Sequence, residues 1–152
     1  MAIWPLPNIK FESLPMDPAL QAFLTGLPTF LLQGGTALAI WSLGLWIYIA
    51  ITPHDEVALV RGGNVAAGLS LGAAAIGIAI PIAATLATSH SMLDLLIWGV
   101  TALTLQLFTF LGVDFLVKGL AQRIKSGEMG AASVLVGVKL GTALITAAAL
   151  MG

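Results

Sequence analysis

The chain has 152 residues, of which 59% are apolar and 9% are charged, with a formal net charge of −1 at pH 7. A water-soluble domain carries roughly 25% charged residues, so this composition excludes an ordinary soluble fold, and the balanced charge gives no basis for nucleic-acid binding. The absence of cysteine excludes disulfides, thiolate metal sites and iron–sulfur ligation. An integral membrane protein is the class that remains.

Residues 1–26 are predicted to form an interfacial N-terminal arm. Asp17 and Pro18 suit the N-cap and first position of a short helix over 19–24, which Gly26 is expected to end.

The rest of the chain consists mainly of long apolar stretches. Each is long enough to cross a bilayer as a helix, which takes about 20 residues. The predicted spans are 27–51, 63–86, 92–117 and 129–151.

The second pair of spans resembles the first, and we divide the chain into repeats over 27–86 and 87–152. The run 61–68 and the run 125–132 both read basic, small, Gly, polar, apolar, then small, and each follows a short amphipathic stretch, 55–60 or 120–124. Two spans per unit return the chain to its starting side, so the repeats should be parallel. The alternative is convergence on a common turn. The predicted fold class is therefore an all-α membrane protein of two parallel two-helix repeats with short cytoplasmic amphipathic helices.

The basic residues predict the orientation. Arg61 lies between the first two spans, and Lys118, Arg123 and Lys125 lie between the last two, whereas the other side holds only Lys10. Because basic residues mark the cytoplasmic side, both termini are expected outside.

The first cytoplasmic loop has a polar motif, made of His54, Asp55, Glu56, Arg61 and Asn64. The first three could bind a cation weakly, but helix capping by Thr52 or Asp55, with Glu56 complementing the helix dipole, is the simpler interpretation. The sequence predicts no metal site, no cofactor and no catalytic residues.

A family resemblance runs through these residues. The run 52–56, the run 61–67 and then Gly77, Pro81, Trp98-Gly99 and Gln106 resemble, in that order, the signature of domain-of-unknown-function family 350. The resemblance covers about residues 28–152 and implies a small, four-span bacterial inner-membrane protein with a duplicated unit and no established activity. Where the family pattern leads us to expect a late Asn in the last span, this chain has Thr146 or Ala147.

Small residues predict helix packing in the second and fourth spans. Gly68 and Gly72 form one Gly-xxx-Gly pair, Gly137 and Gly141 form another, and Ser133 extends the latter by one turn. Small residues let backbones approach closely in lipid, either within the chain or between subunits.

Pro81 removes a backbone donor and crowds the carbonyl of Gly77. A kink is expected there, either as a static bend or as a hinge for gating.

Lys139 lies near the middle of the last span, where a charge is costly. Thr142 and Thr146 share its helical face, Asp114 is the candidate counter-ion, and Gln106 adds a polar group at middle depth of the third span. This stripe could line a path for an ion or solute, or it could be a paired charge that fixes helix register or contacts a partner.

The sequence thus favours a non-enzymatic membrane subunit that packs against copies of itself or against another membrane protein. The alternative is a small oligomeric ion or solute channel or transporter. Lipid and a homo-oligomer or membrane complex are the expected partners.

Overall fold

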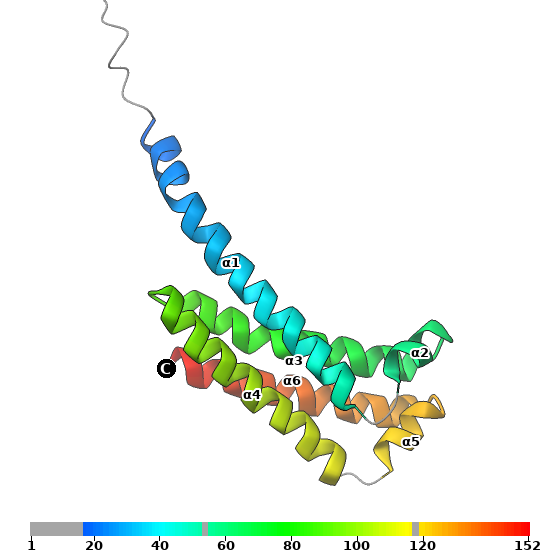
Figure 1. Ribbon diagram of the computed structural model, residues 1–152. Coiled ribbons are helices and arrows are strands. Elements are labelled where there is room, and N and C mark those ends of the chain that lie inside the picture. Colours follow the sequence, from blue (N-terminus) through cyan, green and yellow to red (C-terminus); the bar gives the residue numbers. More distant parts are fainter. Residues whose placement is uncertain (1–16, 53–54, 117–118) are drawn as a thin grey trace, which may run out of the picture. The chain divides into compact units, whose positions relative to one another are not determined.

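A computed structural model describes residues 17–52, 55–116 and 119–152, without the side chains of 114–116. Within these residues the regular structure is helical and contains no strand (Figure 1). The helices are α1 (Pro18–Ile51), α2 (Glu56–Arg61), α3 (Val65–Thr88), α4 (Met92–Leu116), α5 (Leu120–Lys125) and α6 (Met129–Met151). Helices α1, α3, α4 and α6 are long and apolar enough to cross a membrane, which confirms the predicted all-α, four-span class.

The helix boundaries follow the prediction except in α1. Asp17 caps this helix as expected, since its carboxylate accepts the amide of Ala19 at 2.8 Å. The predicted end at Gly26 is wrong, because α1 continues through Gly26 and Pro28 to Ile51. Membrane helices tolerate Gly and Pro in this way, since apolar surroundings penalise an open backbone more than a weak helix former.

The chain divides into two compact units, 1–32 and 33–152. The described part of the first unit is the N-terminal portion of α1. Its apolar side chains are exposed; they include Leu20, Phe23, Leu24, Phe30, Leu31 and Leu32. An apolar helix surface of this kind is suited to a lipid environment.

The core of the second unit is built on α3 and α6, which run side by side in the same direction with α2 and α5 at their N-terminal end (Figure 1). Alanines make this contact close: Ala66 and Ala67 of α3 pack with Ala131 and Ala132 of α6. Of the two alternatives that the sequence left open, packing of these two helices within the chain is present in the structure.

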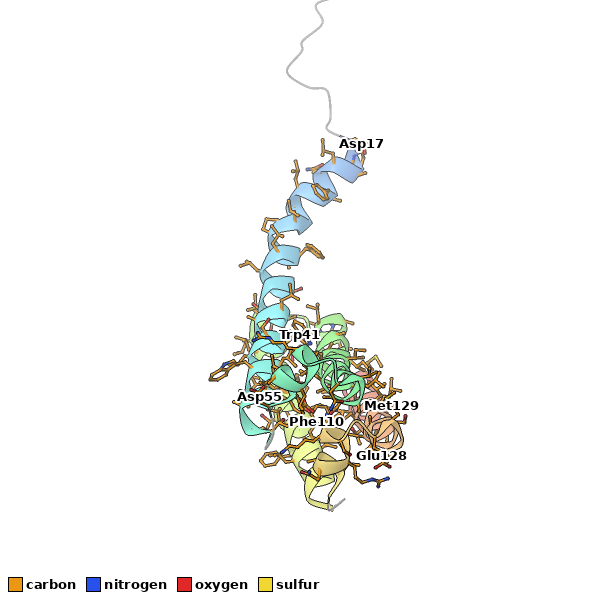
Figure 2. The ribbon with its side chains drawn as sticks, turned by 90° about the vertical axis from the view of Figure 1, so that its right-hand side faces the viewer. Asp17, Trp41, Asp55, Phe110, Glu128 and Met129 are labelled. Atoms are coloured by element: carbon orange, nitrogen blue, oxygen red, sulfur yellow. The ribbon has the colours of Figure 1, made fainter. Side chains whose placement is uncertain are left out.

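A second apolar cluster joins the C-terminal part of α1 to α3 and α4. Its buried members are Ala37, Ile40, Tyr48, Ala74, Ile78, Ile82, Leu103 and Phe110. The indole of Trp41 also donates to the carbonyl of Ala75 at 2.9 Å. Side chains on the outer surfaces are largely apolar (Figure 2).

Two turns of the same design connect the short helices to α3 and α6. Gly63 and Gly127 have φ angles of 85° and 82°, a left-handed conformation that glycine adopts without steric cost. Each turn closes with the pair of backbone bonds that defines a Schellman motif: Gly63 to Val60 and Asn64 to Leu59 in the first, and Gly127 to Ile124 and Glu128 to Arg123 in the second. The equivalence agrees with the predicted repeat, whose origin by duplication stays an interpretation.

Candidate functional site

Lys139 lies at the centre of a buried polar cluster. Its ammonium donates to the hydroxyl of Tyr48 at 2.6 Å, and to the hydroxyl and carbonyl of Ser70 at 3.1 and 3.2 Å. The ammonium nitrogen also lies 4.6 Å from the ring centroid of Tyr48 and 5.3 Å from that of Phe110. Oxygen acceptors and aromatic faces together stabilise a cation in an apolar interior.

Glu56 brings a carboxylate into the same place from α2. Its Oε1 accepts the hydroxyl of Ser70 at 2.7 Å. Because Lys139 donates to that same hydroxyl oxygen, the carboxylate and the ammonium lie within about 6 Å of each other, a separation at which opposite charges stabilise one another. We call Tyr48, Glu56, Ser70, Phe110 and Lys139 the Lys139 cluster.

The cluster is sealed from the surface. Each of its members has an exposed fraction of 3% or less. The rings of Tyr48 and Phe110 meet edge to face, with centroids 5.7 Å apart. The two formal charges are opposite, so the arrangement places a compensated pair of charges in the interior. It contains groups that can exchange a proton, and all of them are buried.

The rest of the predicted polar stripe is satisfied differently. Thr142 donates to the carbonyl of Val138 at 2.9 Å, and Thr146 to that of Thr142 at 2.9 Å, so both hydroxyls bond to their own helix. Gln106 is fully buried, and its amide nitrogen donates to the carbonyl of Lys139 at 3.3 Å. Its Oε1 has no hydrogen-bond partner among the described residues. Of these three residues, Gln106 joins two helices, α4 and α6, whereas Thr142 and Thr146 bond within α6.

The side chain of Asp114 lies outside the described residues, so its pairing with Lys139 stays a prediction. The described contacts of the lysine point to α1 and α3 instead. Sequence reasoning overlooked Tyr48 and Ser70. Tyr48, the one tyrosine of the chain, lies within a span, where its hydroxyl requires a partner. This requirement could have identified Tyr48 as a partner of a polar group in another span.

The predicted packing glycines do not form the contact between α3 and α6. An added Cβ at Gly72, Gly137 or Gly141 would meet nothing within 4 Å, and at Gly68 it would meet only Val60, at 3.9 Å. Ser133 is exposed as well. The helices pack through alanines on other faces, so the predicted small-residue rows are left on the outside of the chain.

Gly77 and Pro81 are both buried, and α3 continues through them. A Cβ at Gly77 would lie 3.1 Å from Phe110, 3.4 Å from the carbonyl of Lys139 and 3.5 Å from Gln106. Gly77 thus permits the close approach of α4 and α6 at this level. This is a packing role, and neither the predicted bend nor a hinge is tested by it.

The residues of the polar motif in the first loop have separate roles. His54 lies outside the described residues, and Arg61 is exposed. Asp55 is the N-cap of α2 and accepts the amide of Ala58 at 2.8 Å, which confirms one of the two predicted caps. Glu56 was expected to complement the helix dipole, but it is buried in the Lys139 cluster.

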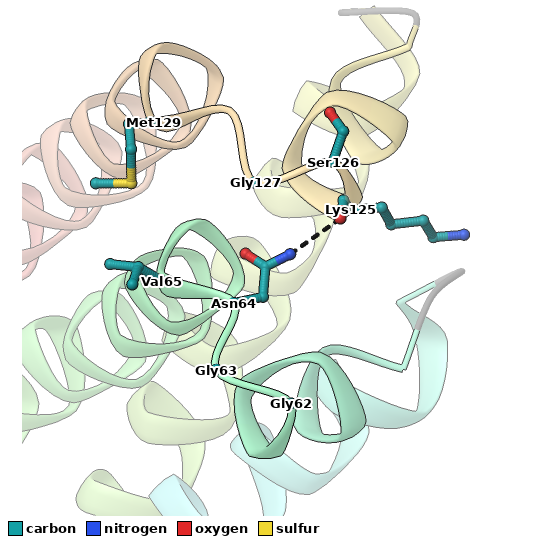
Figure 3. Close-up of a pocket in the computed structure, with 8 residues that line it drawn as sticks. All are labelled: Gly62, Gly63, Asn64, Val65, Lys125, Ser126, Gly127 and Met129. Atoms are coloured by element: carbon teal, nitrogen blue, oxygen red, sulfur yellow. Dashed lines mark hydrogen bonds between the residues drawn. The ribbon is translucent and has the colours of Figure 1, made fainter.

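Asn64 connects the two turns. Its carbonyl oxygen caps α3 at the amide of Ala67, 3.0 Å away, while its amide nitrogen donates to the carbonyls of Ile124 and Lys125, both at 3.0 Å. The residue lines an open hollow of about 480 Å³ between the turns (Figure 3). Asn64 therefore ties the N-terminus of α3 to the C-terminus of α5.

The equivalent position in the second turn, Glu128, makes a different contact. Its two carboxylate oxygens accept hydrogen bonds from Nε and Nη2 of Arg123. Hydrogen bonding to this guanidinium lowers the pKa of the Glu128 carboxyl and raises that of Arg123. Both side chains are exposed, so this pair contributes little to stability.

No group of three or more His, Cys, Asp or Glu side chains that could hold a metal ion is present among the described residues. Four long apolar helices, an apolar exterior and a sealed charged cluster define a multi-pass α-helical membrane protein. Its family follows from comparison. The model of the Domain of Unknown Function family DUF350 matches residues 22–150, and the chain belongs to this family.

Curated relatives support the assignment. Over 111 residues, the chain is 33% identical to the UPF0719 inner membrane protein YjfL of Escherichia coli strain K12, covering 73% of this chain and 79% of that protein. The protein of the same name from Escherichia coli O157:H7 matches with the same values. No solved structure matches the chain.

Proposed function

We propose that the chain acts as a non-enzymatic membrane subunit that associates, through helix packing, with copies of itself or with another membrane protein. One observation carries the proposal. Gly72, Gly137 and Gly141 leave open space on α3 and α6, although these two helices already pack on each other through other faces. In lipid, small residues favour helix association because they let backbones approach.

The sealed state of Lys139 supports the same proposal. A lysine that conducts or binds a solute is expected to face a water-filled cavity, whereas this one is 1% exposed and donates to Tyr48 and Ser70. Its bonds connect α6 to α1 and α3, as expected of a charge that fixes helix register.

The alternative function is a small oligomeric ion or solute channel or transporter. The observation in its favour is the succession of interior polar groups from Glu56 through Ser70 and Lys139 to Gln106. A bundle of four spans has little interior for a pore, so this function requires an oligomer.

We also propose that the protein resides in a bacterial inner membrane, with both termini outside and the turns at Gly63 and Gly127 in the cytoplasm. The family and the relatives named above support the membrane. The basic residues Arg61, Arg123 and Lys125 near these turns support the orientation.

The test is association measured in lipid by single-molecule photobleaching. Gly137→Leu or Gly141→Leu should lower the associated fraction, because bulk at a close crossing separates the backbones. Leu140→Ala, on the same helix, is the matched control. Equal association in the glycine variants and the control would show that this face forms no interface between copies. Support for the subunit role would then have to come from co-purification with a different protein.

A solvent-access scan of α6 distinguishes the alternative. The chain has no cysteine, so single cysteines placed along α6 report water access without background. Protection around Lys139 in the assembled protein supports the subunit. Reaction with a water-soluble thiol reagent there, within a homo-oligomer, supports the channel.

A further inference from the structure

Helices α2 and α5 are equivalent in position but are anchored by opposite chemistry. Both have six residues, and both lead through the same Schellman turn into a long span. Helix α5 buries Leu120 and Ile124. In α2 the buried residue is Glu56, which occupies the first position of its helix, as Leu120 does in α5.

The receiving position on the span differs in the same way. Ser70, the sixth residue of α3, is fully buried and donates to Glu56. The sixth residue of α6 is Val134, which is 57% exposed. The polar anchor is therefore a property of the first repeat, and through Ser70 it extends to Lys139 of α6.

The two anchors respond differently to opening. Lifting α5 would expose Leu120 and Ile124 to water, and nothing offsets that loss of apolar burial. Lifting α2 would break the bonds of Glu56 but would return its carboxylate to water, and hydration offsets much of the loss. Local opening draws on segments with few buried apolar contacts. Helix α2 contributes one partly buried leucine, Leu59, to the apolar cluster in which α5 buries both Leu120 and Ile124.

We propose that α2 is a latch: it opens from α3 while α5 stays docked, and its opening uncovers Ser70 and Lys139. The device requires neither a channel nor a subunit role and goes beyond both. It makes the charge of Lys139 accessible from the α2 end of the bundle in the open state, whereas the closed state seals it.

Hydrogen exchange of the full chain in lipid nanodiscs tests the latch without any substitution. The amides of Leu59 and Gly62 in the first repeat occupy the same places, with the same type of backbone bond, as those of Arg123 and Ser126 in the second repeat. After correction for sequence-dependent intrinsic rates, the first pair should exchange about tenfold or more faster than the second. Equal rates, or slower exchange in α2, would overturn the proposal.

Two variants test the cause. Glu56→Gln keeps the shape but removes the charge, and it should speed exchange in α2 further. The double variant Glu56→Leu with Lys139→Met replaces the polar anchor with an apolar one and removes the buried ammonium, so α2 should then exchange as slowly as α5. Glu128→Gln is the control and should leave α2 unchanged. If Glu56→Gln does not fold, the double variant decides alone, since exchange in α2 that stays as fast as in the native chain would contradict the latch.

Discussion

The ammonium nitrogen of Lys139 lies 2.6 Å from the hydroxyl oxygen of Tyr48, across two helices that are far apart in the sequence. This contact connects the last span to the first. Because the same ammonium reaches Ser70 and, through it, Glu56, one lysine links α1, α2, α3 and α6.

Lys139→Met should destabilise the closed fold by at most about 3–5 kcal/mol, the cost of leaving the Glu56 carboxylate buried without the ammonium. Opening of α2, which returns this carboxylate to water, lowers that cost. The double variant with Glu56→Gln should recover much of this loss, since both charges are then gone. A double-mutant cycle on the free energy of unfolding in bicelles measures the coupling. Additive effects would contradict an electrostatic link between the two residues. The same cycle with Asp114→Asn tests the counter-ion that the sequence predicted.

Tyr48→Phe should cost about 1–3 kcal/mol, the range for leaving a buried donor without its acceptor. The ring remains, so its edge-to-face contact with Phe110 should persist. Thr104→Val is the control, because that exposed hydroxyl bonds only to its own helix. Equal unfolding midpoints for the two variants would show that the tyrosine hydroxyl contributes nothing measurable.

Asn64→Ala should lower stability by about 1–2 kcal/mol for the lost N-cap alone, and by more if the bonds to α5 contribute. Asn64→Asp separates the two parts, because it keeps the capping oxygen but loses the donor to Ile124 and Lys125. At the equivalent turn, the side chain of Glu128 makes no cap hydrogen bond, so Glu128→Ala should lower stability less. If the Asp variant is as stable as the native chain, the connection between the turns has no energetic weight.

A reporter fused after Gly152 should read out as non-cytoplasmic, and one inserted near Ser126 as cytoplasmic. The physical reason is the concentration of Arg61, Arg123 and Lys125 at one end of the bundle. Paired alkaline-phosphatase and fluorescent-protein fusions measure the two sides independently. The reverse pattern would invert the proposed orientation while leaving the helix packing as described.

Local features of the fold could be predicted because their causes are local. The caps at Asp17 and Asp55 depend on a few neighbouring residues, and both are found where the sequence offered them. The predicted helix end at Gly26 was wrong, because glycine ends helices less often in lipid than in water. In lipid, backbone groups outside a helix have no solvent with which to form hydrogen bonds.

The packing glycines show a different limit. The Gly-xxx-Gly pattern indicates a surface where another backbone can approach, but it does not say which one. Helices α3 and α6 pack on each other through Ala66, Ala67, Ala131 and Ala132. Gly137 and Gly141 lie outside this contact. Alanine rows are so common in apolar helices that the sequence did not distinguish the face used within the chain.

The sequence by itself determined the class of protein, the number and length of the spans and the expensive charge at Lys139, because these depend on apolar length and on the cost of burying charge. The tertiary structure alone decided which groups compensate that charge. A lysine side chain reaches about one helical turn from its own backbone, and its partners Tyr48 and Ser70 come from other helices. Only the packing of α1 and α3 around α6 brings them, together with Glu56, within bonding distance.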